Sequence, residues 1–291
     1  MSLSLQPSYV ASLALDSTAV VRLAMDFKSL PFKSRVVEKR HATFEAVAND
    51  RPWQTALLEL QKLIVQSQST HKRGGLPLSI VLSNQFVRYK VIPALPAFTP
   101  ADKALAIATH CFREGYGDAV DDWSIKVNPL PDGDTLLACA IDASLLMAIQ
   151  ALAKQHGCRL KSMQAHLMSG FNTMHRHIKP PPSCYAQIEA GRITIALVRD
   201  GAWQSIAACG TGPEWDEPLS SLITREMLLA GWPHEQLTIY LATPDTLHDK
   251  LATKAFIANT SWKTDVLNTR PVAGYSVTTD QVFAMALSAA G

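Results

Sequence analysis

The layout of short strand-like segments constrains the fold of this chain more than any single motif does. Apolar, β-favouring residues flank a turn at residues 14–18, and a second cluster of the same kind flanks a turn at residues 188–191. Such runs, bounded by turn residues, predict strands. The same β-rich unit is therefore predicted twice, with a helix-containing insertion in the first copy. This doubling indicates an α/β protein with two lobes.

Spacing of apolar residues assigns strands and helices over most of the chain. Strands are predicted at residues 10–15, 19–25, 36–46, 78–82, 86–92, 123–127, 135–141, 159–165, 184–188, 192–198, 202–208, 237–241 and 262–267. Helices are predicted at residues 53–64, 100–116, 143–156, 166–177, 219–230 and 279–289, with a short one after Asp245. A proline run at residues 180–182 stiffens the connection between two lobes, which we place at residues 1–180 and 181–291. We expect the terminal helix to pack back on the first lobe.

Composition excludes several classes of protein. The net charge is +2 and only 18% of residues are charged, which is not the basic footprint of a nucleic-acid binder. Basic groups at residues 28–40 and 71–73 are expected to be solvated strand edges and a loop, or else a contact for an acidic or phosphate-bearing partner. No apolar run reaches the ~20 residues of a membrane span. Residues 1–9 lack the features of a signal peptide, so a cytoplasmic protein is expected.

The five cysteines include no C-x-x-C pair, so we expect reduced thiols and no disulfide framework or zinc site. His175 and His177 lie two apart, a spacing that puts them on different faces of a helix and disfavours a shared metal. Most tryptophans are expected in the core or at the interface between the lobes. The alternative is that Trp203, Trp215 and Trp232, in the second lobe, line a groove for a partner.

Three pairs of segments stand out in the order of elements: LSIVLS at 78–83 with VRYKVIP at 87–93, LLACAI at 136–141 with GCRLK at 157–161, and YAQIEAG at 185–191 with RDG at 199–201. With these segments, the order of elements resembles the actin-like ATPase fold, a two-lobed, ribonuclease H-like α/β architecture with a subdomain inserted in the first lobe. More narrowly, it is similar to the PilM family of type IV pilus assembly, its MshI relatives and the cytoplasmic domain of the type II secretion protein GspL.

The resemblance implies an insertion at residues 94–166 and a docking role. PilM-like proteins bind ATP between the lobes and hold a short cytoplasmic peptide of the membrane protein PilN near the insertion. The implied partner is a PilN-type protein of an inner-membrane pilus or secretion assembly. Through that partner the chain would lie peripherally at the inner membrane, without a span of its own.

In the resembling family, two Asp-x-Gly turns approach the phosphates of ATP: glycine permits close backbone contact, and the acid positions Mg²⁺. The first turn here keeps Asp16, has Thr18 in place of glycine, and offers Arg22 as the basic residue that follows. A Cβ at Thr18 is expected to crowd a phosphate. The second turn has Glu189 as a longer acid and keeps Gly191.

Two further segments bear on this nucleotide site. The third family turn should carry paired glycines, whereas residues 242–245 include Pro244, which removes an N–H donor. Gly210 and Gly212 form a G-x-G between a strand and a helix, which is either a phosphate-binding loop or a plain turn.

The three turns together predict a chain without catalytic residues, bound metal or cofactor. The leading hypothesis is a non-catalytic actin-like scaffold of a type IV pilus or type II secretion-type assembly, which docks a membrane-protein peptide. The alternative is an active ATPase of pilus assembly in which Asp16 and Glu189 flank Mg²⁺ beside ATP. A sugar-kinase-like enzyme is a third class, but no separate catalytic aspartate supports it.

Overall fold

The computed structural model describes residues 7–26, 33–46, 51–69, 75–92, 100–130, 135–178, 182–212, 214–232, 236–242, 262–267, 272–276 and 279–290. Its strands are β1 (Ser8–Leu13), β2 (Ser17–Asp26), β3 (Lys33–Thr43), β4 (Pro77–Leu82), β5 (Val87–Ile92), β6 (Trp123–Pro129), β7 (Leu136–Asp142), β8 (Arg159–Ala165), β9 (Ser183–Glu189), β10 (Arg192–Arg199), β11 (Ala202–Gly210), β12 (Thr238–Ala242) and β13 (Lys263–Val266). Its helices are α1 (Trp53–Ser69), α2 (Ala101–Tyr116), α3 (Ala143–Gln155), α4 (His166–Met174), α5 (Asp216–Leu229) and α7 (Ala284–Leu287), with 3-10 turns η1 (Gly117–Asp122), η3 (Gln281–Phe283) and η4 (Ser288–Ala290). The strands and helices predicted within the described residues are present, with ends shifted by a few residues. The helix predicted after Asp245, and Pro244 of the third family turn, lie outside the described residues.

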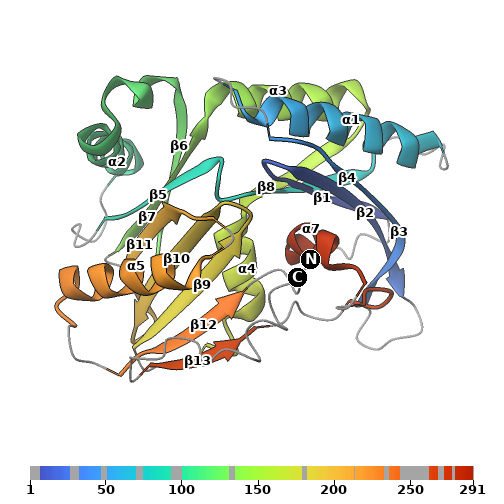
Figure 1. The fold of residues 1–291 in the computed structure, drawn as a ribbon. Coiled ribbons are helices and arrows are strands. Elements are labelled where there is room, and N and C mark those ends of the chain that lie inside the picture. The colour runs from blue at the N-terminus through green and yellow to red at the C-terminus, as the bar shows by residue number, and fades with distance from the viewer. Residues whose placement is uncertain are drawn as a thin grey trace. The chain divides into compact units, whose positions relative to one another are not determined.

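Two five-stranded sheets share one topology (Figure 1). The first sheet has the order β3-β2-β1-β4-β8, and the second has the order β11-β10-β9-β12-β13. In the first sheet, β1, β2 and β3 pair antiparallel, and β4 and β8 continue in parallel from the other edge of β1. In the second sheet, β9, β10 and β11 pair antiparallel, and β12 and β13 continue in parallel from the other edge of β9. The prediction that one β-rich unit occurs twice is confirmed at the level of strand order.

A third, small sheet has the order β5-β7-β6, and all of its pairings are antiparallel. Helix α2 packs on it, with Ala108 and Phe112 against Ala138 and Ala140. The predicted insertion at residues 94–166 stays a prediction, because these pairings define sheets and not the ends of a subdomain. Strand β5 already belongs to the small sheet, whereas β8 pairs with β4 in the first sheet.

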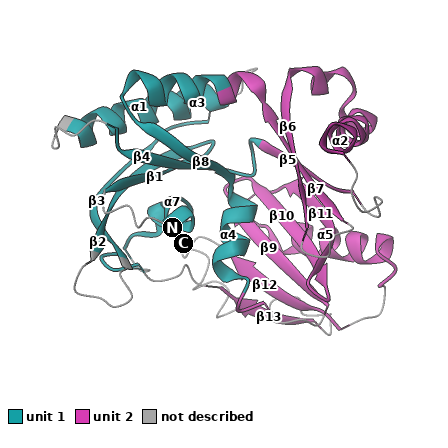
Figure 2. Cartoon of the chain, turned by 180° about the vertical axis from the view of Figure 1, so that it is seen from behind, with its two compact units in different colours: residues 1–86, 147–175, 268–291 teal, residues 87–146, 176–267 magenta. Residues whose placement is uncertain are grey.

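The chain folds into two compact units (Figure 2). One comprises residues 1–86, 147–175 and 268–291, and the other comprises residues 87–146 and 176–267. The small sheet therefore belongs to the same compact unit as the second sheet. These units follow packing, whereas the predicted lobes follow chain order, so the boundary between residues 180 and 181 stays a prediction.

Each five-stranded sheet buries apolar side chains under helices. On the first sheet, α1 packs on β1, β2 and β3, and α7 also packs on the first sheet. The core beneath α7 consists of Val10, Ala19, Val21, Leu23, Phe283, Ala286 and Leu287. On the second sheet, alternate residues of β9 and β10 face α5, because side chains alternate between the faces of a strand.

Three tryptophans of the second unit belong to its interior. Trp215 and Trp232 lie in the core beneath α5, and Trp203 is also buried. The alternative in which these three side chains line a partner groove is therefore wrong, because their rings are already covered by the protein. Among the described helices, none is both long enough and apolar enough to cross a membrane.

Candidate functional site

The first predicted turn joins β1 to β2 and is held by backbone hydrogen bonds. The N–H of Ala14 donates to the carbonyl oxygen of Ser17 at 2.9 Å, and the N–H of Phe44 donates to the carbonyl oxygen of Asp16 at 2.9 Å. The hydroxyl of Ser17 donates to Asp16 Oδ1 at 3.1 Å. The Asp16 side chain is half-buried. No residue of this turn has a positive φ, so its conformation does not require glycine.

Thr18 directs its hydroxyl into the sheet. Its side chain is buried, with a residue exposure of 1%, and its Oγ1 donates to the carbonyl oxygen of Ser12 at 2.7 Å. Thr18 also pairs with Leu13 as the first rung of the β1–β2 ladder. At the position where the resemblance implies a glycine near phosphate, this chain therefore has a β-branched strand residue whose polar group is already bonded.

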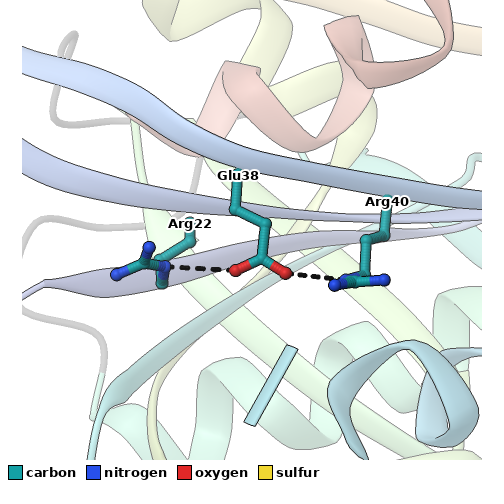
Figure 3. Close-up of polar contacts among 3 residues, drawn as sticks. All are labelled: Arg22, Glu38 and Arg40. Carbon is teal, nitrogen blue, oxygen red and sulfur yellow. Dashed lines mark hydrogen bonds and ion pairs between the residues drawn. The ribbon is translucent and has the colours of Figure 1, made fainter. Parts of the chain in front are cut away.

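Arg22 lies in the middle of β2, six residues beyond Asp16, a distance of about 20 Å along an extended strand. Its Nε donates to Glu38 Oε2 at 3.3 Å, and the Nε of Arg40 donates to Glu38 Oε1 at 2.7 Å (Figure 3). One carboxylate on β3 thus joins two guanidinium groups. The structure does not bring Arg22 to the turn, and its guanidinium is occupied by an ion pair.

The environment of Glu38 stabilises its charged form. Burial alone would raise the pKa of Glu38, but the hydrogen bond and charge of Arg40, a hydrogen bond from Ser67 of α1, and the charge of Arg22 together lower it below its ordinary value. Since Ser67 belongs to α1, this cluster also ties α1 to the first sheet. We assign it a structural role.

The second predicted turn, between β9 and β10, lies beside the G-x-G segment. Gly191 has a φ of +74°, a left-handed conformation that favours glycine. Its carbonyl oxygen accepts a hydrogen bond from the N–H of Thr211 at 3.1 Å, and a Cβ on Gly210 would lie 4.0 Å from the same oxygen. Glu189 is buried at the end of β9, and Gly212 is exposed. The structure therefore brings Glu189, Gly191, Gly210 and Gly212 to one end of the second sheet.

The G-x-G segment is closed by its own hydrogen bonds. The hydroxyl of Thr211 donates to the carbonyl oxygens of Gly212 at 3.2 Å and Glu214 at 3.3 Å. With the Thr211 N–H also bonded, this segment forms a strand end and a turn. No cluster of three or more side chains of the metal-binding types occurs in the part of the chain that the structure describes.

Sequence reasoning missed a polar face on the second sheet. Gln187 and Glu189 of β9 lie opposite Thr194 and Arg192 of β10, on the face away from α5. The signal was present as polar residues at every second position of β9 and at the first two such positions of β10, Arg192 and Thr194. On the opposite face, alternate residues such as Ile193 are apolar and belong to the core beneath α5. Both β9 and β10 are inner strands of the second sheet, so the polar face does not lie at a sheet edge.

Arg192 is the most unusual residue of this face. Its Nε is buried without a hydrogen-bond partner among the described residues. Burial lowers the pKa of the Arg192 guanidinium, and the positive charge of Arg88 on β5 lowers it further, whereas the carboxylate of Glu189 raises it. Two arginines from different sheets therefore lie within electrostatic range of each other.

No protein-family model matches the sequence, and no curated protein is significantly similar to it. Solved structures are similar over nearly the whole chain. A PilM–PilN type IV pilus biogenesis complex aligns with a TM-score of 0.61 and 12% identity, covering 97% of this chain and 97% of that chain. A Bacteroides thetaiotaomicron protein described as having an actin-like ATPase fold and unknown function aligns with a TM-score of 0.60 and 12% identity, covering 96% of each chain.

The cytoplasmic domain of EpsL, an inner-membrane component of the Vibrio cholerae type II secretion system, aligns with a TM-score of 0.57 and 11% identity. That alignment covers 97% of this chain and 95% of that chain. The chain thus has the actin-like ATPase fold, and the fold class and the resemblance predicted from sequence are confirmed. At these identities the likeness establishes the fold, and function has to be argued from the site.

Proposed function

We propose that this chain is a non-catalytic actin-like scaffold that docks a peptide of an inner-membrane assembly protein, in a type IV pilus or type II secretion-type system. The observation that carries this proposal is that polar groups of the two turns already form hydrogen bonds within the chain. The Thr18 hydroxyl is bonded to Ser12, and the Thr211 N–H is bonded to Gly191. Neither donor is free for a phosphate, and Arg22 is paired with Glu38. These turns fit a nucleotide poorly.

The proposed partner is a PilN-type membrane protein, met on the cytoplasmic side of the inner membrane. Support comes from the likeness to the PilM–PilN complex and to the cytoplasmic domain of EpsL. A chain without enzymatic chemistry can act by presenting a surface to an extended or helical segment of a partner. The insertion around residues 94–166 remains the proposed place, by the same resemblance.

A direct binding measurement tests the docking role. The intact protein is titrated with a synthetic peptide that reproduces the N-terminal cytoplasmic segment of a PilN-type membrane protein encoded beside it, and heat is recorded. Saturable binding in the micromolar range, about 8 kcal/mol, is expected. A scrambled peptide of the same composition is the control. If the native peptide binds no better than the scrambled one, the docking role is lost.

The second candidate, an active ATPase, is favoured by one observation. Gly191 retains a positive φ beside the buried acid Glu189, as a phosphate turn requires. In that case Asp16 and Glu189 would hold Mg²⁺, and ATP would supply the transferable phosphoryl group. Saturating Mg-ATP, at about 100 times its dissociation constant, would stabilise the protein by about 2.7 kcal/mol.

Thermal unfolding with and without Mg-ATP separates the two candidates. The scaffold proposal predicts the same Tm in both conditions, because Mg-ATP does not bind the folded state. A rise in Tm that disappears in Asp16→Asn and Glu189→Gln would establish the ATPase candidate instead.

A further inference from the structure

Strand β3 forms one edge of the first sheet (Figure 1). It is 11 residues long, pairs with β2 on one side, and has no strand on its other side among the described residues. An edge strand presents a row of backbone N–H and C=O groups that can pair with another chain. Two hydrogen bonds determine which residues of β3 present these groups.

The first of these bonds lies at the end of β3. The N–H of Phe44 donates to the carbonyl oxygen of Asp16 at 2.9 Å, so the backbone polar groups of Phe44 point toward β2. Successive residues of a strand direct their N–H and C=O groups to opposite edges. Those of Lys39, His41 and Thr43 therefore point away from β2, and we call these three the outward residues.

The outward residues are accessible, and their backbone groups are unpaired. All three are exposed. Lys39 contacts Asp280, and the ring of His41 meets that of Phe283 edge to face with centroids 5.6 Å apart, but both contacts involve side chains. No hydrogen bond joins the backbone of the outward residues to a further strand or loop among the described residues. Three N–H donors and three C=O acceptors thus face away from the sheet.

The second bond shows that this edge accepts an extended segment. The N–H of Val36 donates outward to the carbonyl oxygen of Ala273 at 2.7 Å, and Arg35 forms a parallel bridge with Ala273. A bulge in the β2–β3 pairing separates this bridge from the outward residues. The extra residue of the bulge explains why an even-numbered residue points outward before it and odd-numbered residues point outward after it.

Charge determines which kind of strand suits this edge. Four basic residues of β3, Lys33, Arg35, Lys39 and Arg40, stand against the single acid Glu38, so four positive charges minus one negative charge give a formal net charge of +3. Like charges directly opposite each other destabilise a strand pair, so a second copy of the same edge is disfavoured. A strand with acidic side chains is favoured for the same reason.

The backbone pattern favours a peptide over a phosphate-bearing partner. A phosphodiester could accept hydrogen bonds from the outward N–H groups, but it has no donor for the outward carbonyl oxygens. An extended peptide offers one donor and one acceptor at every second residue, which matches both.

We propose that the outward edge of β3 docks an acidic, extended segment of a partner protein by strand addition. The backbone of the segment pairs with the outward residues, and its carboxylates meet the basic side chains of β3. This inference concerns the first sheet and does not depend on the proposed docking of a PilN-type peptide at the insertion. Backbone pairing gives the contact its geometry, and charge selects the partner.

The test uses the intact protein and the probe acetyl-Thr-Glu-Thr-Glu-Thr-Glu-Thr-amide, with glutamine at the three acidic positions in its neutral match. Backbone amide exchange is followed by ¹⁵N NMR at low ionic strength. Saturating glutamyl probe should slow exchange at Lys39, His41 and Thr43 by at least about tenfold. Arg40 and Ala42 should be unchanged, because their N–H groups already point toward β2. The glutaminyl probe should bind about tenfold more weakly.

Two changes test the backbone pairing itself. A glutamyl probe with N-methylated backbone amides keeps every carboxylate but cannot donate to the outward carbonyl oxygens, so it should not bind. Thr43→Pro removes one outward N–H and no bond to β2, and an edge strand tolerates proline where its N–H faces solvent. This variant should retain the native Tm and bind the glutamyl probe about three- to tenfold more weakly, the usual effect of one hydrogen bond.

Arg35→Glu tests the role of charge. It reverses one exposed charge beside the outward residues and should weaken binding of the glutamyl probe. Lys103→Glu is the matched control, because it makes the same change at an exposed position of α2 and should bind as the native protein does.

Four outcomes would overturn the proposal. Equal binding of the glutamyl and glutaminyl probes would remove the role of charge. Unchanged exchange at the outward residues, or equal binding of the N-methylated probe, would remove strand addition. Binding of phosphatidylglycerol vesicles without binding of the glutamyl probe would assign the basic strand to a lipid surface instead.

Discussion

At the residue scale, two buried threonine hydroxyls differ in whether they form a hydrogen bond. Thr18 and Thr194 are both buried on sheet faces, and both are 1% exposed. The Thr18 hydroxyl is bonded to the Ser12 carbonyl oxygen, whereas the Thr194 hydroxyl has no partner among the described residues. The two threonines therefore differ in energetics although they share burial, residue type and secondary structure.

Replacing each threonine by valine, which has nearly the same shape, should change stability in opposite directions. Thr18→Val removes a formed hydrogen bond and should lower the free energy of unfolding by about 1 kcal/mol, because the Ser12 carbonyl oxygen loses its donor. Thr194→Val removes an unsatisfied hydroxyl and should raise the free energy of unfolding by about 1 kcal/mol. Urea unfolding of the two variants measures both values. Equal losses in the two would show that Thr194 is satisfied in the free protein.

Glu38 should make stability depend on pH. Because the folded-state pKa of Glu38 lies below its ordinary value of 4.5, its stabilising contribution is fully present above that value and is lost as pH falls through the folded-state pKa. Glu38→Gln should therefore be less stable than the native protein at neutral pH, and the difference should shrink in acid. Thermal unfolding at a series of pH values checks this.

Glu59→Gln is the control for that series. Glu59 pairs with Lys62 on the surface of α1, a type of ion pair that contributes little. A difference between native protein and Glu38→Gln that stays constant from neutral to acid pH would contradict the ion-pair account.

At the element scale, the C-terminal turns complete the first sheet. Phe283 and Leu287 pack on the side chains of Val10 and Val21. Lys39 Nζ lies 2.6 Å from Asp280 Oδ1 and 5.8 Å from the centroid of the Phe283 ring. A short helical segment that could not be stable alone is thus held by one apolar core and one ion pair.

Phe283→Ala should lower the free energy of unfolding by about 3 kcal/mol, because it opens a cavity in the core between α7 and the first sheet. Val282→Ala, at the neighbouring position, should change it by less than about 0.5 kcal/mol, because Val282 is 48% exposed. Chemical denaturation of both variants gives the comparison. Similar losses at the two positions would mean that the segment does not pack as described.

Sequence patterns predict these elements well where the information is local. The β10–β11 hairpin is an example, because residues 199–201 read as a tight turn, and Asp200 and Gly201 have φ values of +53° and +79°. The pairing of β5 was not predictable in the same way. Strand β5 pairs with β7, about 50 residues later in the chain, and such long-range pairing leaves no local signature.

The candidate site shows the same limit. Asp16 and Gly191 lie in the turns that the sequence predicts, because turn residues are local signals, whereas Thr18 belongs to β2 and Glu189 ends β9. The partner of Arg22 could not be read from spacing, because Glu38 lies on the next strand and only the register brings them together. The polar face around Arg192 was missed because only the pairing of β9 with β10 brings its residues together.

At the scale of the whole molecule, two compact units each have their own core. The second unit buries Ile223 of α5 against β9 and β10, and the first unit buries Leu60 of α1. Separate cores allow separate local opening. The fold confirmed by the solved structures is thus built from two parts whose stabilities can be perturbed one at a time.

Cavity-forming variants in the two units should weaken protection against hydrogen exchange unequally. Ile223→Ala should accelerate exchange mainly in β9 and β10, and Leu60→Ala mainly in β1 and β2, each corresponding to a loss of about 2–5 kcal/mol. Mass-spectrometric hydrogen exchange on both variants measures this. A uniform loss of protection across both units in either variant would indicate a single cooperative structure.

The packing of α7 on β1 has a consequence for biosynthesis. Roughly 270 residues separate β1 from α7, and translation at about 5–20 residues per second takes on the order of 10–50 s to make them. Throughout that interval Val10, Val21 and Leu23 lack the helix that covers them. An apolar sheet face that stays uncovered for so long is a natural substrate for chaperones, so the nascent chain, more than the finished protein, should depend on them.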